Sequence, residues 1–129
     1  MQNLINRIVP LMDPVLTRRA HGRTRAGFRA DVKIRKLVLV SSSGWWEMGN
    51  FGTVLRTVEE LAKDFSVKFA DALLRPHAGR MVENVEKAEE IFEAARQAGY
   101  ELVKEGRISK SLLKIIGQPL NSVEKPRTS

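Results

Sequence analysis

Apolar side chains recur at helical spacing in three long stretches of the chain. The first stretch predicts a helix within residues 1–12. The second predicts a helix over 51–65 with Asn50 as its N-cap, and the third a helix over 82–105 that ends at Gly106. We expect the third helix to bury one stripe of residues, namely Val85, Ala88, Phe92, Ala95, Gly99 and Leu102.

Two other stretches have the patterns of β-strands. The continuous apolar run Leu37–Val40 predicts a strand buried on both faces, as in parallel sheets. Residues 65–74 alternate less cleanly and predict an edge strand, which Pro76 closes. A short helix that begins at Ser109 or Ser111 completes the series.

A strand, a helix and a second strand in this order predict a right-handed βαβ unit and therefore an α/β fold. Two strands are too few for a sheet that stands alone, and a strand buried on both faces needs neighbours on both sides. We therefore expect residues 1–116 to be half of an α/β domain. Within it, residues 13–35 are predicted to be a long basic loop, and residues 117–129 a polar tail.

The net charge is concentrated near the N-terminus. The chain has 129 residues and a formal charge of +7, from 22 Lys and Arg against 15 Asp and Glu. Residues 1–36 contain nine of the basic and two of the acidic side chains, so the rest of the chain is neutral. The Arg-rich segment 18–36 suits phosphate binding, but it offers only Phe28 for stacking on bases. The alternatives are a charged loop at an oligomer interface or near the anionic groups of a cofactor.

The absence of cysteine excludes several classes of site. It rules out disulfides, thiolate metal sites, a cysteine nucleophile and an iron–sulfur cluster held by this chain alone. No apolar run reaches the roughly 18 residues that a membrane span needs, and no signal-peptide pattern is visible. We expect a cytoplasmic protein with no membrane partner and no metal.

The segment Ser41-Ser-Ser-Gly-Trp-Trp-Glu47 is the clearest candidate site. It follows the first predicted strand, and ligands of open α/β sheets bind outside the carboxyl ends of strands. Indole rings can cover the face of a planar ligand while hydroxyl and amide groups meet its heteroatoms. The alternative is that one Trp packs in the core and the serines cap the next helix. The candidate ligand-binding residues are Ser42, Ser43, Gly44, Trp45 and Trp46.

The two histidines suggest different roles. His77 follows the second predicted strand, where it could donate a hydrogen bond or serve as an acid at a ligand edge. The alternative is a surface loop residue. We expect His21, among arginines, to be solvated. The sequence identifies no catalytic residue.

Several segments together resemble flavodoxin-like NAD(P)H-dependent FMN reductases, and most closely their iron–sulfur flavoprotein or multimeric flavodoxin branch. Lys36-Leu-Val-Leu-Val-Ser-Ser-Ser-Gly-Trp-Trp-Glu47, followed by Asn50-Phe51, is similar to the fourth strand of that family and its loop. Met1-Gln-Asn-Leu-Ile-Asn-Arg7 resembles the helix after its third strand. Leu73-Leu-Arg-Pro-His77 resembles the end of its fifth strand, and residues 82–105 its final helix.

The resemblance covers residues 1–116 of this chain but only the C-terminal half of the family's domain. It implies a sheet of order 2-1-3-4-5, NAD(P)H as electron donor, and FMN at the strand ends, with Ser42, Ser43, Gly44, Trp45 and Trp46 beside the flavin ring. The family's phosphate loop, its loop after the third strand and its clustered cysteines have no counterpart here.

Two functional hypotheses follow from the sequence. The first is the C-terminal part of an FMN-dependent NAD(P)H oxidoreductase, completed by self-association or by a chain that supplies the N-terminal half. The alternative is a non-enzymatic interaction module that binds nucleic acid through residues 18–36. We expect no nucleic-acid partner under the first hypothesis.

Overall fold

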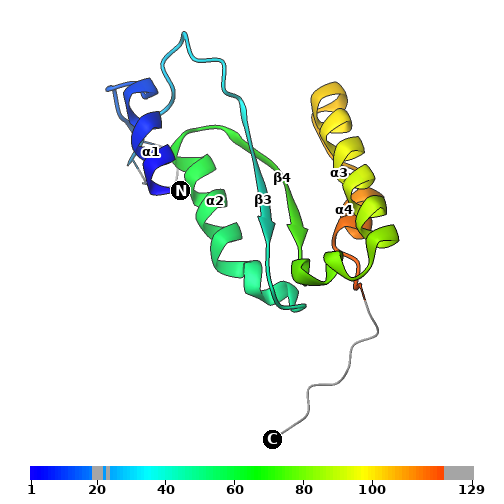
Figure 1. Cartoon of the computed structure of the whole chain (residues 1–129). Helices are drawn as coiled ribbons and strands as arrows, with labels where there is room; N and C mark the ends of the chain where they lie inside the picture. The colour runs from blue at the N-terminus through cyan, green and yellow to red at the C-terminus, as the bar shows by residue number, and fades with distance from the viewer. Residues whose placement is uncertain (19–21, 23, 121–129) are drawn as a thin grey trace, which may run out of the picture. The chain divides into compact units, whose positions relative to one another are not determined.

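The computed structural model describes residues 1–18, 22 and 24–120. Helices and strands follow one another as α1 (Gln2–Ile8), η1 (Val9–Leu11), β1 (Thr17–Arg18), β2 (Thr24–Arg25), β3 (Lys36–Ser42), η2 (Met48–Phe51), α2 (Gly52–Asp64), β4 (Lys68–Arg75), η3 (Ala78–Val82), α3 (Val85–Glu105) and α4 (Lys110–Ile116) (Figure 1). The η elements are 3₁₀ helices. His21, for which we expect solvation, lies outside the described residues. So do residues 121–129, which make up most of the predicted polar tail.

The chain forms two compact units. Unit 1 comprises Met1–Leu37 and Arg56–Ala70, and unit 2 comprises Val38–Leu55 and Asp71–Ser129. The boundaries fall inside β3, α2 and β4, so these three elements contribute to both units.

Strands β3 and β4 form a two-stranded parallel sheet, connected through α2. At the start of the pair the Lys68 amide donates to the Arg35 carbonyl oxygen (3.1 Å), and at its end the Ser43 amide donates to the Arg75 carbonyl oxygen (3.0 Å). The predicted strand–helix–strand order and the mixed α/β class are thus confirmed.

The prediction that Leu37–Val40 is buried on both faces is wrong. Leu39 is only 7% exposed, but Val40 is 73% exposed. Successive side chains of a strand point to opposite faces, and parallel sheets bury both faces under helices, but no described segment covers the face of β3 at Val40. The strand is also longer than predicted, because Ser41 and Ser42 belong to it.

Unit 1 contains more regular structure than the predicted loop over residues 13–35. Strands β1 and β2 pair antiparallel, with Thr17 opposite Arg25, and Gly22 adopts a left-handed backbone (φ 79°) between them. The β-branched threonines favour the extended conformation, and the glycine tolerates the positive φ. Phe28 anchors the segment, because its ring lies 5.3 Å from that of Phe65. A short hairpin and an aromatic contact therefore replace a structureless loop.

The core of unit 2 lies between α3 and α4. It is built from Ala94, Ala98, Ile108 and Ile116, with Leu73 of β4 packed against them. Helix α3 begins at Asn84, whose side chain accepts a hydrogen bond from the Lys87 amide, and ends at Gly106 with a left-handed backbone (φ 73°). Ser109 is the N-cap residue of α4. The two predicted helix boundaries, Gly106 and Ser109, are confirmed.

The buried stripe predicted for α3 is partly wrong. Val85 and Phe92 are 62% and 65% exposed, and Gly99 is exposed too. The face that packs instead consists of Ala88, Ile91, Ala94 and Ala98. The helix has two apolar faces, and its alanine-rich face is the one on which α4 packs, because small side chains permit close approach.

Candidate functional site

The candidate site is formed by the loops that leave the carboxyl ends of β3 and β4. Beyond the strands, the Ala78 amide donates to the Ser43 carbonyl oxygen (2.9 Å). The His77 amide donates to the Trp45 carbonyl oxygen (2.8 Å). Together with the bond from Ser43 to Arg75, these contacts continue the pairing past the strands and hold the two loops side by side.

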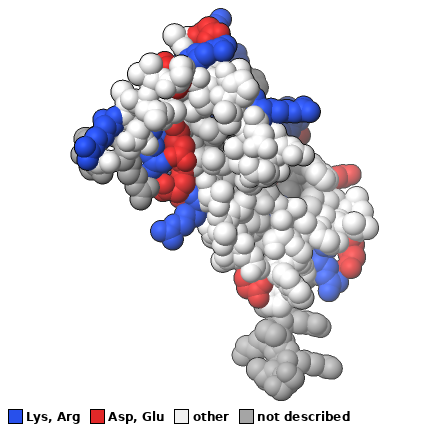
Figure 2. Space-filling model, turned by 90° about the vertical axis from the view of Figure 1, so that its left-hand side faces the viewer, with Lys and Arg blue, Asp and Glu red and all other residues white. Residues whose placement is uncertain are grey.

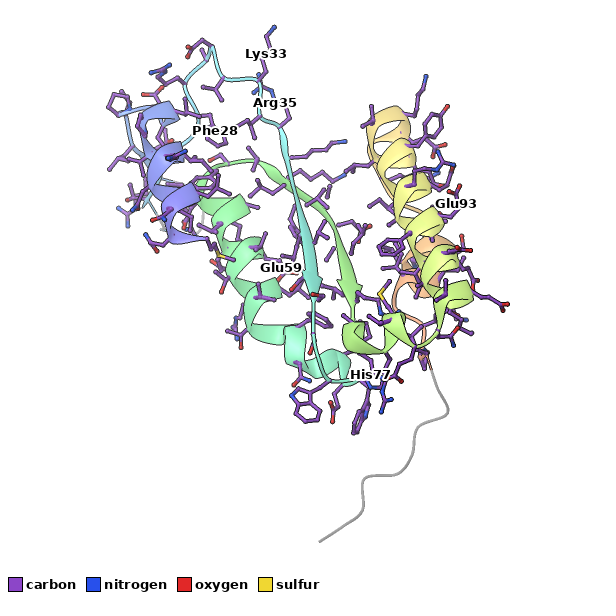
Figure 3. All side chains as sticks on the ribbon, viewed as in Figure 1. Phe28, Lys33, Arg35, Glu59, His77 and Glu93 are labelled. Carbon is purple, nitrogen blue, oxygen red and sulfur yellow. The ribbon has the colours of Figure 1, made fainter. Side chains whose placement is uncertain are left out.

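Three aromatic rings meet in these loops. Trp45 and Trp46 pack edge to face with centroids 6.3 Å apart, and Trp46 meets the His77 imidazole in the same way at 6.1 Å. Trp45 is 67% exposed, whereas Trp46 is half-buried. His77 lies in the connection after β4 (Figure 3). The structure thus joins His77 to the tryptophan loop, although the sequence placed it more than 30 residues away.

His77 adopts a backbone conformation that residues other than glycine rarely have. Its φ and ψ are 55° and 38°, in the left-handed region. Histidine enters this region more often than most residues with a β-carbon, but the conformation still costs free energy that surrounding contacts must offset. Here the amide bond to Trp45 and the ring contact with Trp46 supply those contacts.

The predicted ligand-binding residues differ in which of their polar groups remain available to a ligand. Ser42 ends β3 and is exposed, and the Ser43 hydroxyl oxygen accepts a hydrogen bond from the Trp45 amide (3.2 Å). Among the described residues, the amides of Gly44 and Trp46 have no hydrogen-bond acceptor. The loop therefore offers an exposed indole and two amide donors to a ligand.

The alternative interpretation of the serines as helix caps is not what the structure shows. Glu47 is the N-cap residue of η2, and Asn50, the predicted N-cap of the following helix, lies inside η2. The Asn50 side chain donates to the Glu47 carboxylate (3.4 Å) instead. Phe51 is 2% exposed, and its burial places a 3₁₀ turn before α2, so the helix starts later than predicted.

Sequence reasoning gave no structural role to Arg75, which anchors the second loop. Its side chain is buried, and its guanidinium donates to the carbonyl oxygens of Pro76 (2.6 Å), Ile116 (2.6 Å) and Gln118 (2.8 Å). Burial lowers the pKa of Arg75, yet a guanidinium remains charged at neutral pH. Ile116 ends α4, so the charge also faces the negative end of that helix. No local pattern in the sequence pairs an arginine with carbonyl groups about 40 residues away.

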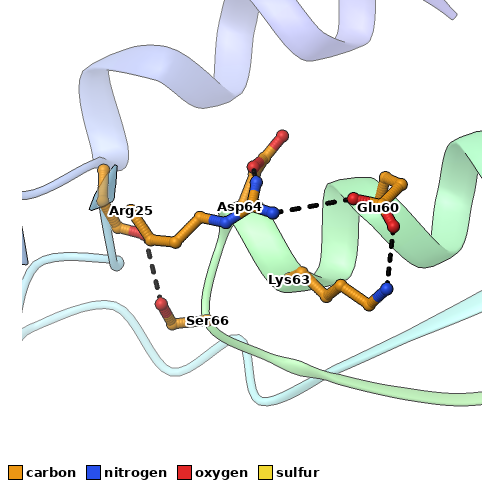
Figure 4. Close-up of polar contacts among 6 residues, drawn as sticks. Arg25, Glu60, Lys63, Asp64 and Ser66 are labelled. Atoms are coloured by element: carbon orange, nitrogen blue, oxygen red, sulfur yellow. Dashed lines mark hydrogen bonds and ion pairs between the residues drawn. The ribbon is translucent and has the colours of Figure 1, made fainter. Parts of the chain in front are cut away.

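Three described arginines of the Arg-rich segment, Arg25, Arg29 and Arg35, make contacts inside the chain. Arg25 forms ion pairs with Asp64 and with Glu60 (3.6 Å) of α2 (Figure 4). Arg29 donates twice to the Asp31 carboxylate (3.1 and 3.0 Å), and this pairing raises the pKa of Arg29 and lowers that of Asp31. Arg35 donates to the Val32 carbonyl oxygen (2.6 Å).

These internal contacts reduce the number of cations that face a partner. On the face drawn in Figure 2, Lys and Arg are interspersed with Asp and Glu rather than gathered in one continuous patch. Lys33 and Arg35 come from the stretch just before β3 (Figure 3). Arg19 and Arg23 of the segment lie outside the described residues. The contacts that are described give no support to nucleic-acid binding through residues 18–36.

Residues 1–18, 22 and 24–120 show neither a metal site nor a membrane-spanning helix. They contain no group of three His, Asp or Glu side chains placed to hold a metal ion. No helix among them has the length and apolar character that crossing a membrane requires. No protein-family model, curated protein or solved structure matches this chain.

Proposed function

We propose that this chain is the C-terminal part of a flavodoxin-like, FMN-dependent NAD(P)H oxidoreductase, in which it forms one wall of the flavin-ring site. The observation that supports the proposal most is the aromatic cluster of Trp45, Trp46 and His77 at the carboxyl ends of two parallel strands. That edge is where open α/β sheets bind their ligands.

The residues present suit the ring of a flavin. An isoalloxazine is planar and aromatic, with hydrogen-bond acceptors along one edge, so it needs a flat apolar surface and nearby donors. The exposed Trp45 indole offers the surface, and the amides of Gly44 and Trp46 offer the donors. When bound, FMN supplies the hydride-transfer chemistry, while these residues bind and orient the ring and exclude water from one face.

The same residues do not suit the phosphate of FMN. The loop Ser43–Glu47 has no basic side chain, and the Arg75 guanidinium is buried against three carbonyl oxygens. We therefore expect the phosphate contacts to come from a second chain, either another copy or a chain that supplies the N-terminal half of the domain. NAD(P)H would be the electron donor of the complete assembly.

A titration with two flavins tests the proposal. Trp fluorescence of the purified chain is followed as riboflavin or FMN is added up to about 100 µM. Because the described residues of the proposed wall offer no basic group to the phosphate, we expect both flavins to quench the emission with similar dissociation constants, on the order of tens of micromolar. If neither flavin quenches the emission, with or without a co-expressed partner chain, the flavin role is wrong.

Two variants test whether the flavin binds at the loop that carries Trp45. Trp45→Ala removes the exposed indole and should weaken flavin binding about 2- to 10-fold, the range for one aromatic contact. Tyr100→Ala is the matched control, because Tyr100 is also a half-exposed aromatic residue (56%) but lies on α3. Equal losses in both variants would show that binding does not occur at the proposed wall.

A further inference from the structure

Helix α3 has a second stripe, with exposed apolar side chains in it, that no other described residue covers. Val85, Phe92 and Val103 are 62%, 65% and 85% exposed, and among the described residues nothing packs over them. They belong to a series whose members are spaced alternately four and three residues apart, namely Val85, Glu89, Phe92, Arg96, Gly99 and Val103. Spacing that averages 3.5 residues is the repeat of a helix that pairs with another helix.

Gly99 lies within this stripe, and no described residue packs against it. A β-carbon built on it would have no atom within 4 Å, and its backbone is ordinary α-helix. Glycine inside a helix lowers helix stability, so its presence here has a cost without a local benefit. A glycine on an exposed helix face does allow the backbone of a second helix to approach closely.

The stripe complements itself when two copies lie antiparallel. The two-fold axis passes between the helices at the level of residue 94, although Ala94 itself lies on the opposite, buried face. In this arrangement Val85 faces Val103 of the second copy, and Glu89 faces Gly99 of the second copy. Phe92 then faces Arg96 of the second copy. The edge of the Arg96 guanidinium is held by Glu93 of its own helix, so its planar face is the part left for a cation–π pair with Phe92, formed twice. In a parallel pair, Glu89 would face Glu89 and Arg96 would face Arg96, so like charges would meet.

We propose that a second copy of this chain binds to this stripe, so that two α3 helices pair antiparallel about position 94. The proposal does not depend on flavin binding, because the loops of the candidate site take no part in the stripe. The helix has 21 residues, or three heptads, so the paired surface is short. We expect a reversible dimer with a dissociation constant on the order of micromolar.

Engineered cysteines test the orientation directly, because the chain has no cysteine of its own. Val85→Cys and Val103→Cys are made separately, mixed and oxidised. Antiparallel pairing brings the two positions together and should give a covalent dimer from the mixture, while either variant alone remains mostly uncoupled. Efficient coupling of Val85→Cys with itself would indicate parallel pairing and overturn the proposal.

A charge placed in the stripe tests whether the surface drives association. Phe92→Glu should raise the dimer dissociation constant at least 30-fold in analytical ultracentrifugation, since it removes both cation–π pairs and the central apolar contact. Leu4→Glu is the matched control, because Leu4 has nearly the same exposure (63%) but lies on α1. A monomeric wild-type chain at about 100 µM, or a dimer unaffected by Phe92→Glu, would show that the stripe is not the interface.

Discussion

The two units of this protein use arginine in opposite ways. In unit 1, the Arg25 side chain is 14% exposed and pairs with carboxylates of α2 whose side chains are 39% and 49% exposed. In unit 2, Arg75 is buried and donates to three carbonyl oxygens beside an apolar core of alanine and isoleucine. The same charged group pairs with partly exposed carboxylates in one unit and with backbone carbonyl groups of distant segments in the other. Its environment, rather than its charge, decides its role.

Replacing Arg75 should have the largest effect on stability. Arg75→Met removes the donors to Pro76, Ile116 and Gln118 while keeping an apolar stem of similar length. We expect the free energy of unfolding to fall by about 2–4 kcal/mol, because buried carbonyl groups lose their partners. Urea denaturation followed by far-UV circular dichroism measures the change.

Arg75→Lys serves as the control for charge. Lysine keeps the cation but cannot donate to three acceptors in the plane of a guanidinium, so we expect an intermediate loss. If Arg75→Met were as stable as the wild type, the buried link would contribute nothing and the contrast between the units would disappear.

Replacing Arg25 should have a smaller effect. Arg25→Met removes the ion pairs with Glu60 and Asp64 and should lower the free energy of unfolding by about 1 kcal/mol. Because both acceptors are partly exposed, raising the salt concentration from about 0.05 M to about 1 M should shrink the difference between variant and wild type. A double-mutant cycle with Asp64→Asn isolates the pair. A coupling energy that does not change with salt would contradict a solvent-accessible pair.

The smallest effect should come from Asp31. Its pKa is lowered from the ordinary value of 3.8 by the hydrogen bonds from Arg29. A carboxylate whose pKa is lower in the folded state stabilises the fold above the unfolded pKa, and this contribution is lost as pH falls through the folded pKa. We expect Asp31→Asn to lower the melting temperature by no more than about 2 °C at pH 7, with the difference vanishing as the pH falls through the lowered pKa of the folded state. A difference that persists at low pH would point to a packing role for Asp31.

Much of the fold could be predicted from local sequence patterns. The helical spacing in residues 1–12, the apolar run at Leu37–Val40, Gly106 and Ser109 each specify structure through their immediate neighbours. The predicted strand–helix–strand order is present as a parallel pair. The membership of residues 1–116 in half of a flavodoxin-like domain stays a prediction.

The failures occurred where contacts between distant segments decide the outcome. Periodicity alone could not choose between two apolar faces of α3, and α4 packs on the face with Ala94 and Ala98. The exposure of Val40 likewise depends on whether another segment packs on that face of the sheet, which the pattern of the strand itself does not reveal. For the candidate site, the sequence indicated the tryptophan loop and, separately, His77, but not the contact between them.

The sequence by itself determined that the charge of +7 lies in residues 1–36, that cysteine chemistry is absent, and where most helices and strands lie. These properties follow from composition or from contacts within a few residues. Only the tertiary structure decided that Arg25 turns to α2, that Arg75 holds the end of β4 to the end of α4, and that the rings of Trp46 and His77 meet. The physical reason is that such contacts join residues about 30 to 40 positions apart, and only the packing of helices and strands brings these residues together.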